Sequence, residues 1–204
     1  MRPDRLIRKG QALDLPSGSL CGVDEAGRGP IAGPVCAAAV VWRRCHELEG
    51  LADSKQVSPL RRGILAAQIK QEALAWSVAF ASVDEIDRFN ILRASLLAME
   101  RAVRALPALP DAAIFDGLHC PELPLLRIAV VQGDARVAAV SAASILAKTA
   151  RDEVMESLAK EFPEYGFEQH KGYPTALHLE RLKMHGITPH HRRSFAPVRN
   201  CACA

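Results

Sequence analysis

The sequence predicts an α/β fold in which a mixed β-sheet is covered by helices. Short apolar runs of a strand's length come first, and further runs then alternate with longer segments of helical periodicity. No shift in composition marks a domain boundary within the 204 residues. We therefore expect residues 19–204 to form a single domain.

The first half of the chain predicts three strands behind a polar segment. We expect residues 1–18 to be a flexible N-terminal segment. Residues 19–24 are a short apolar strand, and residues 27–33 hold three glycines and a proline, which is typical of a tight loop. The continuous apolar run 35–42 suits a strand buried on both faces, and residues 75–81 form the third strand.

A helix begins at Ser58-Pro59, because serine caps free N–H groups and proline suits the first helical position. Leu60, Ile64 and Ala67 keep helical spacing on one face, which we expect to be its apolar face.

One longer helix follows the third strand. Ser82 and Glu85 have the spacing of a capping box, and Pro107 and Pro110 end the helical pattern. Its apolar stripe consists of Leu92, Leu96, Met99, Val103 and Leu106.

The second half alternates strands and helices. Residues 112–115 and 127–131 are apolar runs between turn residues and are expected as strands. Residues 135–162 contain almost no helix breaker and predict a long helix, and residues 175–185 predict a last one. From about residue 166 onward the chain forms a helical C-terminal part.

Composition excludes several classes of protein. Lys and Arg total 26 against 23 Asp and Glu, and a net charge of +3 permits a nucleic-acid partner without requiring one. No apolar run approaches the roughly 20 residues of a membrane span, and no signal peptide is recognisable. The six cysteines form no C-x-x-C motif. We therefore expect a cytoplasmic protein with reduced thiols and no membrane partner.

Carboxylates stand at three of the predicted strand ends. Asp24 and Glu25 end the first strand, Asp116 ends the fourth, and Asp134 follows the fifth, each beside a glycine. Strand ends of open α/β sheets line ligand crevices. Clustered carboxylates repel one another, and oxygen ligands suit Mg²⁺ or Mn²⁺.

Each acid alone is better explained as a solvated turn residue or a helix cap, and Asp134 in particular could cap the long helix. The four together favour a metal site. Neighbouring strand residues point to opposite faces, so Asp24 and Glu25 can share that site only if the strand ends or kinks there.

Two loops could bind a ligand beside these acids. Gly27-Arg28-Gly29 lets a sugar hydroxyl or a phosphate approach the backbone, although an ordinary tight turn explains the spacing equally simply. Lys171 and Tyr173 could contact phosphate and stack on a sugar, or belong to a basic surface loop. Further candidates for phosphate contact are Lys55, Lys148, Arg151, His190, His191, Arg192 and Arg193.

Several sequence blocks resemble the ribonuclease HII family. The opening block, Val23 to Pro30, is followed by an Ala-Gly-Pro-Val block at residues 32–35. The resemblance continues in order to about residue 198. The further matching blocks are Asp53-Ser54-Lys55, Ile86-Asp87, Asn90-Ile91-Leu92, Phe115-Asp116-Gly117, Gly133-Asp134, Ala142 to Lys148, Arg151-Asp152, Tyr165-Gly166-Phe167, His170 to Tyr173, and His191-Arg192 with Ser194-Phe195.

The resemblance implies an RNase H-like fold: a five-stranded mixed sheet flanked by helices, with a helical C-terminal extension. It implies endonucleolytic cleavage of RNA in RNA–DNA hybrids, and cleavage 5′ of single ribonucleotides embedded in duplex DNA, leaving 3′-hydroxyl and 5′-phosphate ends. The protein would act as a monomer with Mn²⁺ or Mg²⁺, two ions per site during catalysis.

The resemblance also implies residue roles. Asp24, Glu25, Asp116 and Asp134 would be the catalytic, metal-binding acids. The substrate-binding residues would be Gly27, Arg28 and Gly29 at the 2′-hydroxyl, Lys55 and Lys148 at phosphates, and Tyr173 at the sugar of the junction. Two departures from the family pattern are Pro174, where glycine is common, and Gln56-Val57, where a second lysine and a leucine are more usual.

Three alternatives compete with this interpretation. A non-catalytic hybrid binder would usually have lost one of the four acids, and none is missing. Ribonuclease HIII typically carries an extra N-terminal domain, for which the roughly 18 residues before the first strand leave no room. An unrelated Mg²⁺-dependent phosphatase would show a phosphate-binding Gly-Lys-Ser/Thr loop, and the sequence has none.

Overall fold

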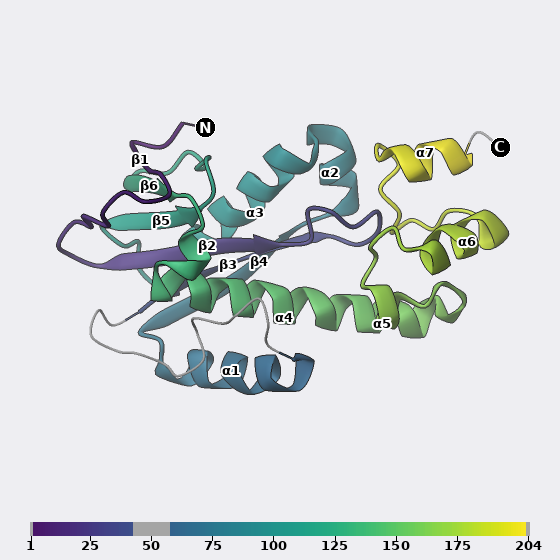
Figure 1. Cartoon of the computed structure of the whole chain (residues 1–204), viewed down its shortest axis with the longest axis horizontal. Coiled ribbons are helices and arrows are strands. Elements are labelled where there is room, and N and C mark those ends of the chain that lie inside the picture. Colours follow the sequence, from purple (N-terminus) through teal and green to yellow (C-terminus); the bar gives the residue numbers. More distant parts are fainter. Residues whose placement is uncertain (1, 43–57, 203–204) are drawn as a thin grey trace.

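The computed structural model describes residues 2–42 and 58–202. They form a six-stranded mixed sheet with helices on both faces, which confirms the α/β prediction (Figure 1). In spatial order the strands are β1 (Arg5–Ile7), β6 (Leu126–Val130), β5 (Ala112–Asp116), β2 (Leu20–Ala26), β3 (Val35–Val41) and β4 (Ala75–Ala81). β3 is antiparallel to β2 and β4, and the other neighbouring pairs are parallel.

The expectation of five strands is wrong, because β1 adds a sixth from within the segment that was expected to be flexible. Ile7 pairs with Val130 of β6 and is only 3% exposed. Asp4 reinforces this pairing through its ion pair with Arg127, whose Nη2 lies 2.8 Å from Asp4 Oδ1. A three-residue edge strand has no periodicity of its own and is defined only by its distant partner.

The helices are α1 (Pro59–Glu72), α2 (Val83–Phe89), α3 (Ile91–Arg104), α4 (Ala138–Glu161), α5 (Phe167–His170), α6 (Ala176–His185) and α7 (Ala196–Ala202). Two 3₁₀ turns, η2 (Gly133–Ala135) and η3 (Pro163–Tyr165), flank α4. The last three helices form the expected helical C-terminal part, at one end of the sheet in Figure 1. No helix of the described chain is long and apolar enough to span a membrane.

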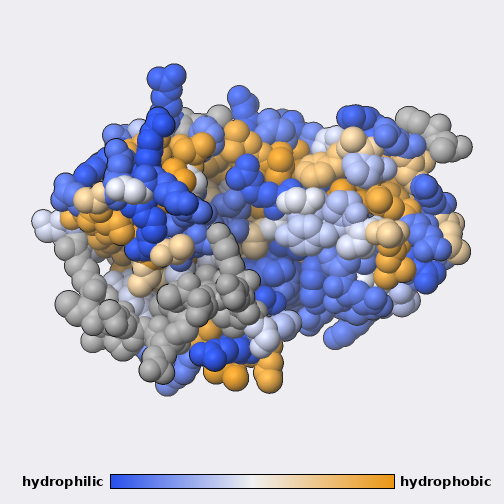
Figure 2. Space-filling model, viewed as in Figure 1, coloured by the Kyte–Doolittle hydropathy of each residue, from blue (hydrophilic) through white to orange (hydrophobic). Residues whose placement is uncertain are grey.

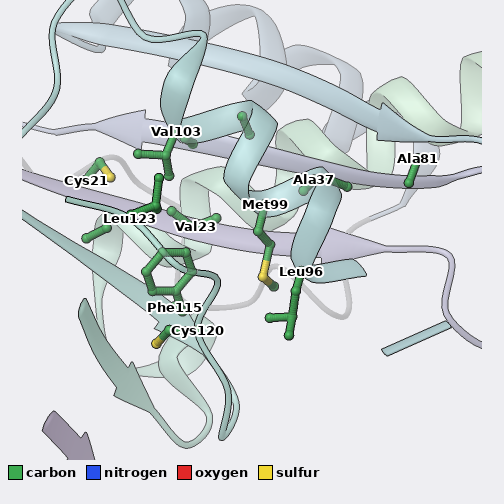
Figure 3. Close-up of a cluster of buried hydrophobic side chains, with 14 of the residues drawn as sticks. Cys21, Val23, Ala37, Ala81, Leu96, Met99, Val103, Phe115, Cys120 and Leu123 are labelled. Atoms are coloured by element: carbon green, nitrogen blue, oxygen red, sulfur yellow. The ribbon is translucent and has the colours of Figure 1, made fainter. Parts of the chain in front are cut away.

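The two faces of the sheet have separate hydrophobic cores. On one face, Met99 and Val103 of α3 pack against Val23 and Phe115 of the central strands (Figure 3). On the other face, α4 runs along β2 and β3, and α1 packs on α4. Gly22 permits this close approach, because a Cβ atom there would lie 2.1 Å from the Ala139 carbonyl carbon. The central strands are thereby buried on both faces.

The apolar face predicted for α1 is wrong. Leu60 and Ile64 are 79% and 55% exposed, whereas Leu65 and Ile69 are buried against the neighbouring elements. The segment contains apolar residues at helical spacing on two faces of the helix. The packing of α1 on α4 buries the face that carries Leu65 and Ile69.

The single helix predicted after β4 is two helices, α2 and α3. The capping box of Ser82 and Glu85 starts α2 as predicted. The chain then breaks at Asn90, whose φ is +71° and whose side chain accepts a hydrogen bond from the Arg93 N–H. The positive φ at Asn90 ends α2, and its side chain caps α3, so this one residue separates the two helices.

Candidate active site

Asp24 and Asp116 lie side by side at the end of two parallel strands. The register of β2 and β5 pairs Val23 with Phe115, so the next residue on each strand is one of the two aspartates. Both side chains point to the α4 face, because Asp24 pairs with Ala38 of the α4-side core and Asp116 pairs with Val130 of the α4-side core. Strand register therefore brings together two acids that are 92 residues apart.

Burial and like charges act on Asp24. Its side chain is 6% exposed, and burial raises the pKa of this carboxyl well above its usual value, with further raising by the charges of Glu25 and Asp116. Hydrogen bonds from the Ser144 side chain of α4 and from the Glu25 N–H, at 2.8 Å, oppose that shift. A bound divalent cation would relieve this repulsion and favour the charged form of Asp24.

Glu25 also belongs to this site. The strand was expected to end at Asp24 and Glu25, but β2 continues to Ala26. Burial raises the pKa of Glu25, the nearby Arg28 opposes that shift, and the Asp116 charge adds to it. Glu25 also lines one cavity with Ser144 and Lys148 of α4. The three carboxylates therefore lie within electrostatic reach of one another.

Asp134 lies in η2, where it is 3% exposed. The N–H of the preceding Gly133 donates a 2.6 Å hydrogen bond to Asp116 Oδ1, which attaches this turn to the end of β5. Val137, not Asp134, is the N-cap of α4, so the helix-cap explanation is wrong. Among the described residues, no group of three or more His, Cys, Asp or Glu side chains is arranged to hold a metal ion in this structure. Asp134 is connected to the other acids through the hydrogen bond from Gly133 to Asp116.

An open cavity of about 410 Å³ lies beside the acids. It brings together Glu25, the loop of Gly27, Arg28 and Gly29, and two predicted substrate contacts, Lys148 and Tyr173. A Cβ atom on Gly29 would lie 3.3 Å from Tyr173 Cε1, so the ring packs directly on this glycine. Lys55, the remaining predicted contact, lies outside the described residues.

Pro174 leaves Tyr173 well supported. The Tyr173 N–H donates to the His170 carbonyl at 2.9 Å, and the Tyr173 carbonyl accepts from the Thr175 N–H at 2.8 Å. Proline lacks a backbone N–H, but the hydrogen bonds of this turn do not use the N–H of residue 174.

Arg62 of α1 also lines the cavity and was missed in the sequence. Its Nη2 lies 2.7 Å from Asp152 Oδ2, while Lys148 Nζ lies 2.6 Å from the other oxygen of the same carboxylate. Arg62 is one of two adjacent arginines, and nothing local distinguishes them. Only the packing of α1 on α4 turns Arg62 toward the acids.

Three predicted phosphate contacts are instead internal. Arg151, Arg192 and His191 are each at most 1% exposed. The two arginines bind backbone carbonyls, and His191 bonds to His178 within the C-terminal part. Their cationic or aromatic character suggested a surface role, but the C-terminal helices cover them.

Known proteins similar to this chain place it in a family. A sequence model described as Ribonuclease HII matches residues 21–198. Ribonuclease HII of Thiobacillus denitrificans is 57% identical over 192 residues, which cover 94% of this chain and 94% of that protein. The chain belongs to the ribonuclease HII family. It is accordingly a ribonuclease H, an endonuclease of a family that acts on RNA-containing nucleic acid.

Solved structures agree with this placement. The crystal structure of ribonuclease H2 from Pyrococcus horikoshii is 28% identical, with a TM-score of 0.75, and the match covers 90% of this chain and 96% of that one. A Bst-RNase HIII structure in complex with Mn²⁺, 21% identical, shares the fold with a TM-score of 0.73 over 93% of this chain and 71% of that one. The RNase H-like fold is thereby confirmed.

The buried histidines of this ribonuclease HII predict acid sensitivity. His178 Nε2 lies 3.1 Å from His191 Nε2, a hydrogen bond that needs one neutral acceptor. Burial lowers the pKa of His178 to about 4 and that of His191 to about 3, against about 6.5 in the unfolded chain. Between these values the unfolded state binds more protons, so stability falls as pH falls, with a slope of up to about 1.4 kcal/mol per pH unit for each histidine.

Urea unfolding at pH 7, 6 and 5 and constant ionic strength measures this slope. His191→Gln should reduce the slope of stability against pH by up to the contribution of one histidine. An equal slope in the unsubstituted protein and in His191→Gln would contradict the prediction.

Proposed function

We propose that this enzyme hydrolyses the RNA strand of RNA–DNA hybrids and cuts 5′ of single ribonucleotides embedded in duplex DNA, leaving 3′-hydroxyl and 5′-phosphate ends. The observation that carries the proposal is the shared cavity of Glu25, Gly29 and Tyr173 next to Asp24 and Asp116. A ribose held on the glycine loop would place its adjoining phosphate at the acids. The 2′-hydroxyl is the group that distinguishes RNA from DNA.

Asp24, Glu25, Asp116 and Asp134 would hold the divalent cations. The donor set fits, because it consists of hard carboxylate oxygens whose mutual repulsion and burial already raise the pKa of Asp24. Bound Mg²⁺ or Mn²⁺, as a pair, would supply charge neutralisation at the attacking and leaving oxygens. The carboxylates would orient those ions, while Ser144 and the Glu25 N–H hold Asp24 in place.

The positively charged side chains around the cavity would bind the phosphates of the nucleic-acid backbone. Lys148 is about one-third exposed and is oriented by Asp152, which also orients Arg62. Arg28 is half exposed and pairs with Glu25 at 3.3 Å. Such residues contact phosphates without reading sequence. Lys55 is proposed as a further contact of this kind.

Tyr173 and the glycine loop would recognise the ribose. Tyr173 is 44% exposed and lines the cavity, with its ring atoms Cε1 and Cδ1 next to Gly29. An exposed ring in this position can pack on a sugar at the ribo-to-deoxyribo junction. The backbone of this loop offers polar groups, and at Gly27 and Gly29 no side chain stands in the way.

The proposal places a monomeric enzyme in the cytoplasm. Cys21, Cys36, Cys120 and Cys201 are free thiols, as suits a reducing compartment. The surface over α4 and α5 is hydrophilic (Figure 2).

The test is cleavage of a 5′-labelled DNA duplex that contains one ribonucleotide, with Mg²⁺, with Mn²⁺ and with EDTA. We expect a single cut 5′ of the ribonucleotide that requires the cation, and no cut in the matched all-DNA duplex. Binding of RNA–DNA hybrid without cleavage under every metal condition would identify a binding protein instead and overturn the proposal.

A further inference from the structure

Arg192 is fully buried, and its guanidinium binds the carbonyls of the glycine loop. It donates to the Gly27 carbonyl at 2.7 Å and to the Arg28 carbonyl at 3.2 Å. Its other acceptors are the carbonyls of Pro30 at 2.7 Å, Gly33 at 2.9 Å and Pro34 at 3.2 Å. One side chain from the C-terminal part thus spans the whole loop, about 160 residues away in sequence.

Arg151 of α4 binds the far half of the same loop. It is 1% exposed and donates to the carbonyls of Ala32 and Pro34, both at 3.1 Å, and to the Lys171 carbonyl at 3.0 Å. Within the described chain, neither Arg151 nor Arg192 forms an ion pair with a carboxylate. Burying two guanidinium charges costs free energy of solvation. The hydrogen bonds from these guanidinium groups to backbone carbonyls offset that cost.

The orientation of the carbonyls determines where the loop's donors point. In a planar trans peptide, the carbonyl of one residue and the N–H of the next point in opposite directions. Because the Gly27 and Arg28 carbonyls face Arg192, the N–H groups of Arg28 and Gly29 face away from it. Among the described residues these two N–H groups donate to no protein acceptor, and both residues line the cavity.

We propose that Arg192 is a positioning residue for ribose recognition: it holds the Gly27 and Arg28 carbonyls and thereby directs the N–H groups of Arg28 and Gly29 at the substrate. The inference rests on the proposed function, since it assigns the origin of the selectivity for RNA. Lysine cannot replace Arg192 in this role, because a single ammonium with three donors does not span five carbonyls.

The test compares the dissociation constants of two duplexes, one with a single ribonucleotide and one all-DNA, measured by fluorescence anisotropy in EDTA. We expect the unsubstituted enzyme to prefer the ribonucleotide duplex by about tenfold, the effect of about one good hydrogen bond. Arg192→Lys should reduce this preference to less than twofold, with affinity for the all-DNA duplex changed by less than twofold. A loss of folded protein alone would not alter the preference.

Arg127→Lys is the control, because Arg127 is also mostly buried but bonds Asp4, Glu122 and the Pro121 carbonyl, away from the glycine loop. It should keep the preference. Loss of the preference in Arg127→Lys as well, or its retention in Arg192→Lys, would overturn the inference. If the unsubstituted enzyme neither prefers nor cuts the ribonucleotide duplex, the proposed function itself fails.

A second measurement needs no substitution. In the unsubstituted enzyme, the amide protons of Arg28 and Gly29 should exchange more slowly with solvent when the ribonucleotide duplex is bound than when the all-DNA duplex is bound. Equal exchange in the two complexes would also overturn the inference, even if Arg192→Lys did not fold.

Discussion

Asp24→Asn is expected to reduce cleavage at least about 10³-fold while binding to an RNA–DNA hybrid changes little. The amide has the shape of the carboxylate and keeps an oxygen that accepts from the Glu25 N–H, but it lacks the charge that would hold a divalent cation. The variant should be at least as stable as the parent, because the substitution removes a buried charge that Glu25 and Asp116 repel. Single-turnover cleavage, hybrid binding and urea unfolding measure the three effects.

Asp14→Asn is the control for this prediction. The Asp14 side chain is 84% exposed and pairs with Arg5, far from the acids in the fold. It should cleave at the parent rate. Cleavage by Asp24→Asn at the parent rate would remove Asp24 from the metal site.

Gly29→Leu is expected to lower kcat/KM for a single embedded ribonucleotide about 10²-fold. A Cβ atom at this position already lies 3.3 Å from Tyr173 Cε1, so the leucine branches must displace the ring or fill the cavity. Either outcome moves the ribose away from the acids. Gel assays of cleavage at the single ribonucleotide measure the loss.

Two variants separate this effect from a general one. Gly29→Ala should lose much less activity, because an exposed ring can shift by the few tenths of an ångström that a methyl group needs. Gly63→Leu introduces the same side chain on α1, where no atom lies within 4 Å of the added Cβ, and should keep full activity. If Gly29→Leu cleaved at the single ribonucleotide as fast as the parent, the idea that the loop binds the ribose would be contradicted.

Much of the fold is encoded locally. The capping box of Ser82 and Glu85 and the Thr175 cap of α6 appear where predicted, because each depends on a few neighbouring residues. The strands β2 to β6 follow from continuous apolar runs. The β1 strand and the buried face of α1 do not, since a distant strand and a packed helix decide them.

The candidate site divides in the same way. The end of β5 at Asp116 was predicted from the sequence, whereas β2 continues two residues beyond Asp24. The parallel register of β2 and β5 makes the two aspartates neighbours. Lys148 and Tyr173 line the same cavity as Glu25, and their contact with substrate stays a prediction. Arg62 was not predicted, because its orientation depends on how α1 packs on α4.

The sequence by itself determined the α/β class and the place of Asp116 as the last residue of a strand, because apolar runs and the charged residues that end them are properties of short segments. Only the tertiary structure decided that Arg151 and Arg192 are internal. Whether a guanidinium meets water or a buried carbonyl depends on chain segments more than a hundred residues away, which no local pattern records.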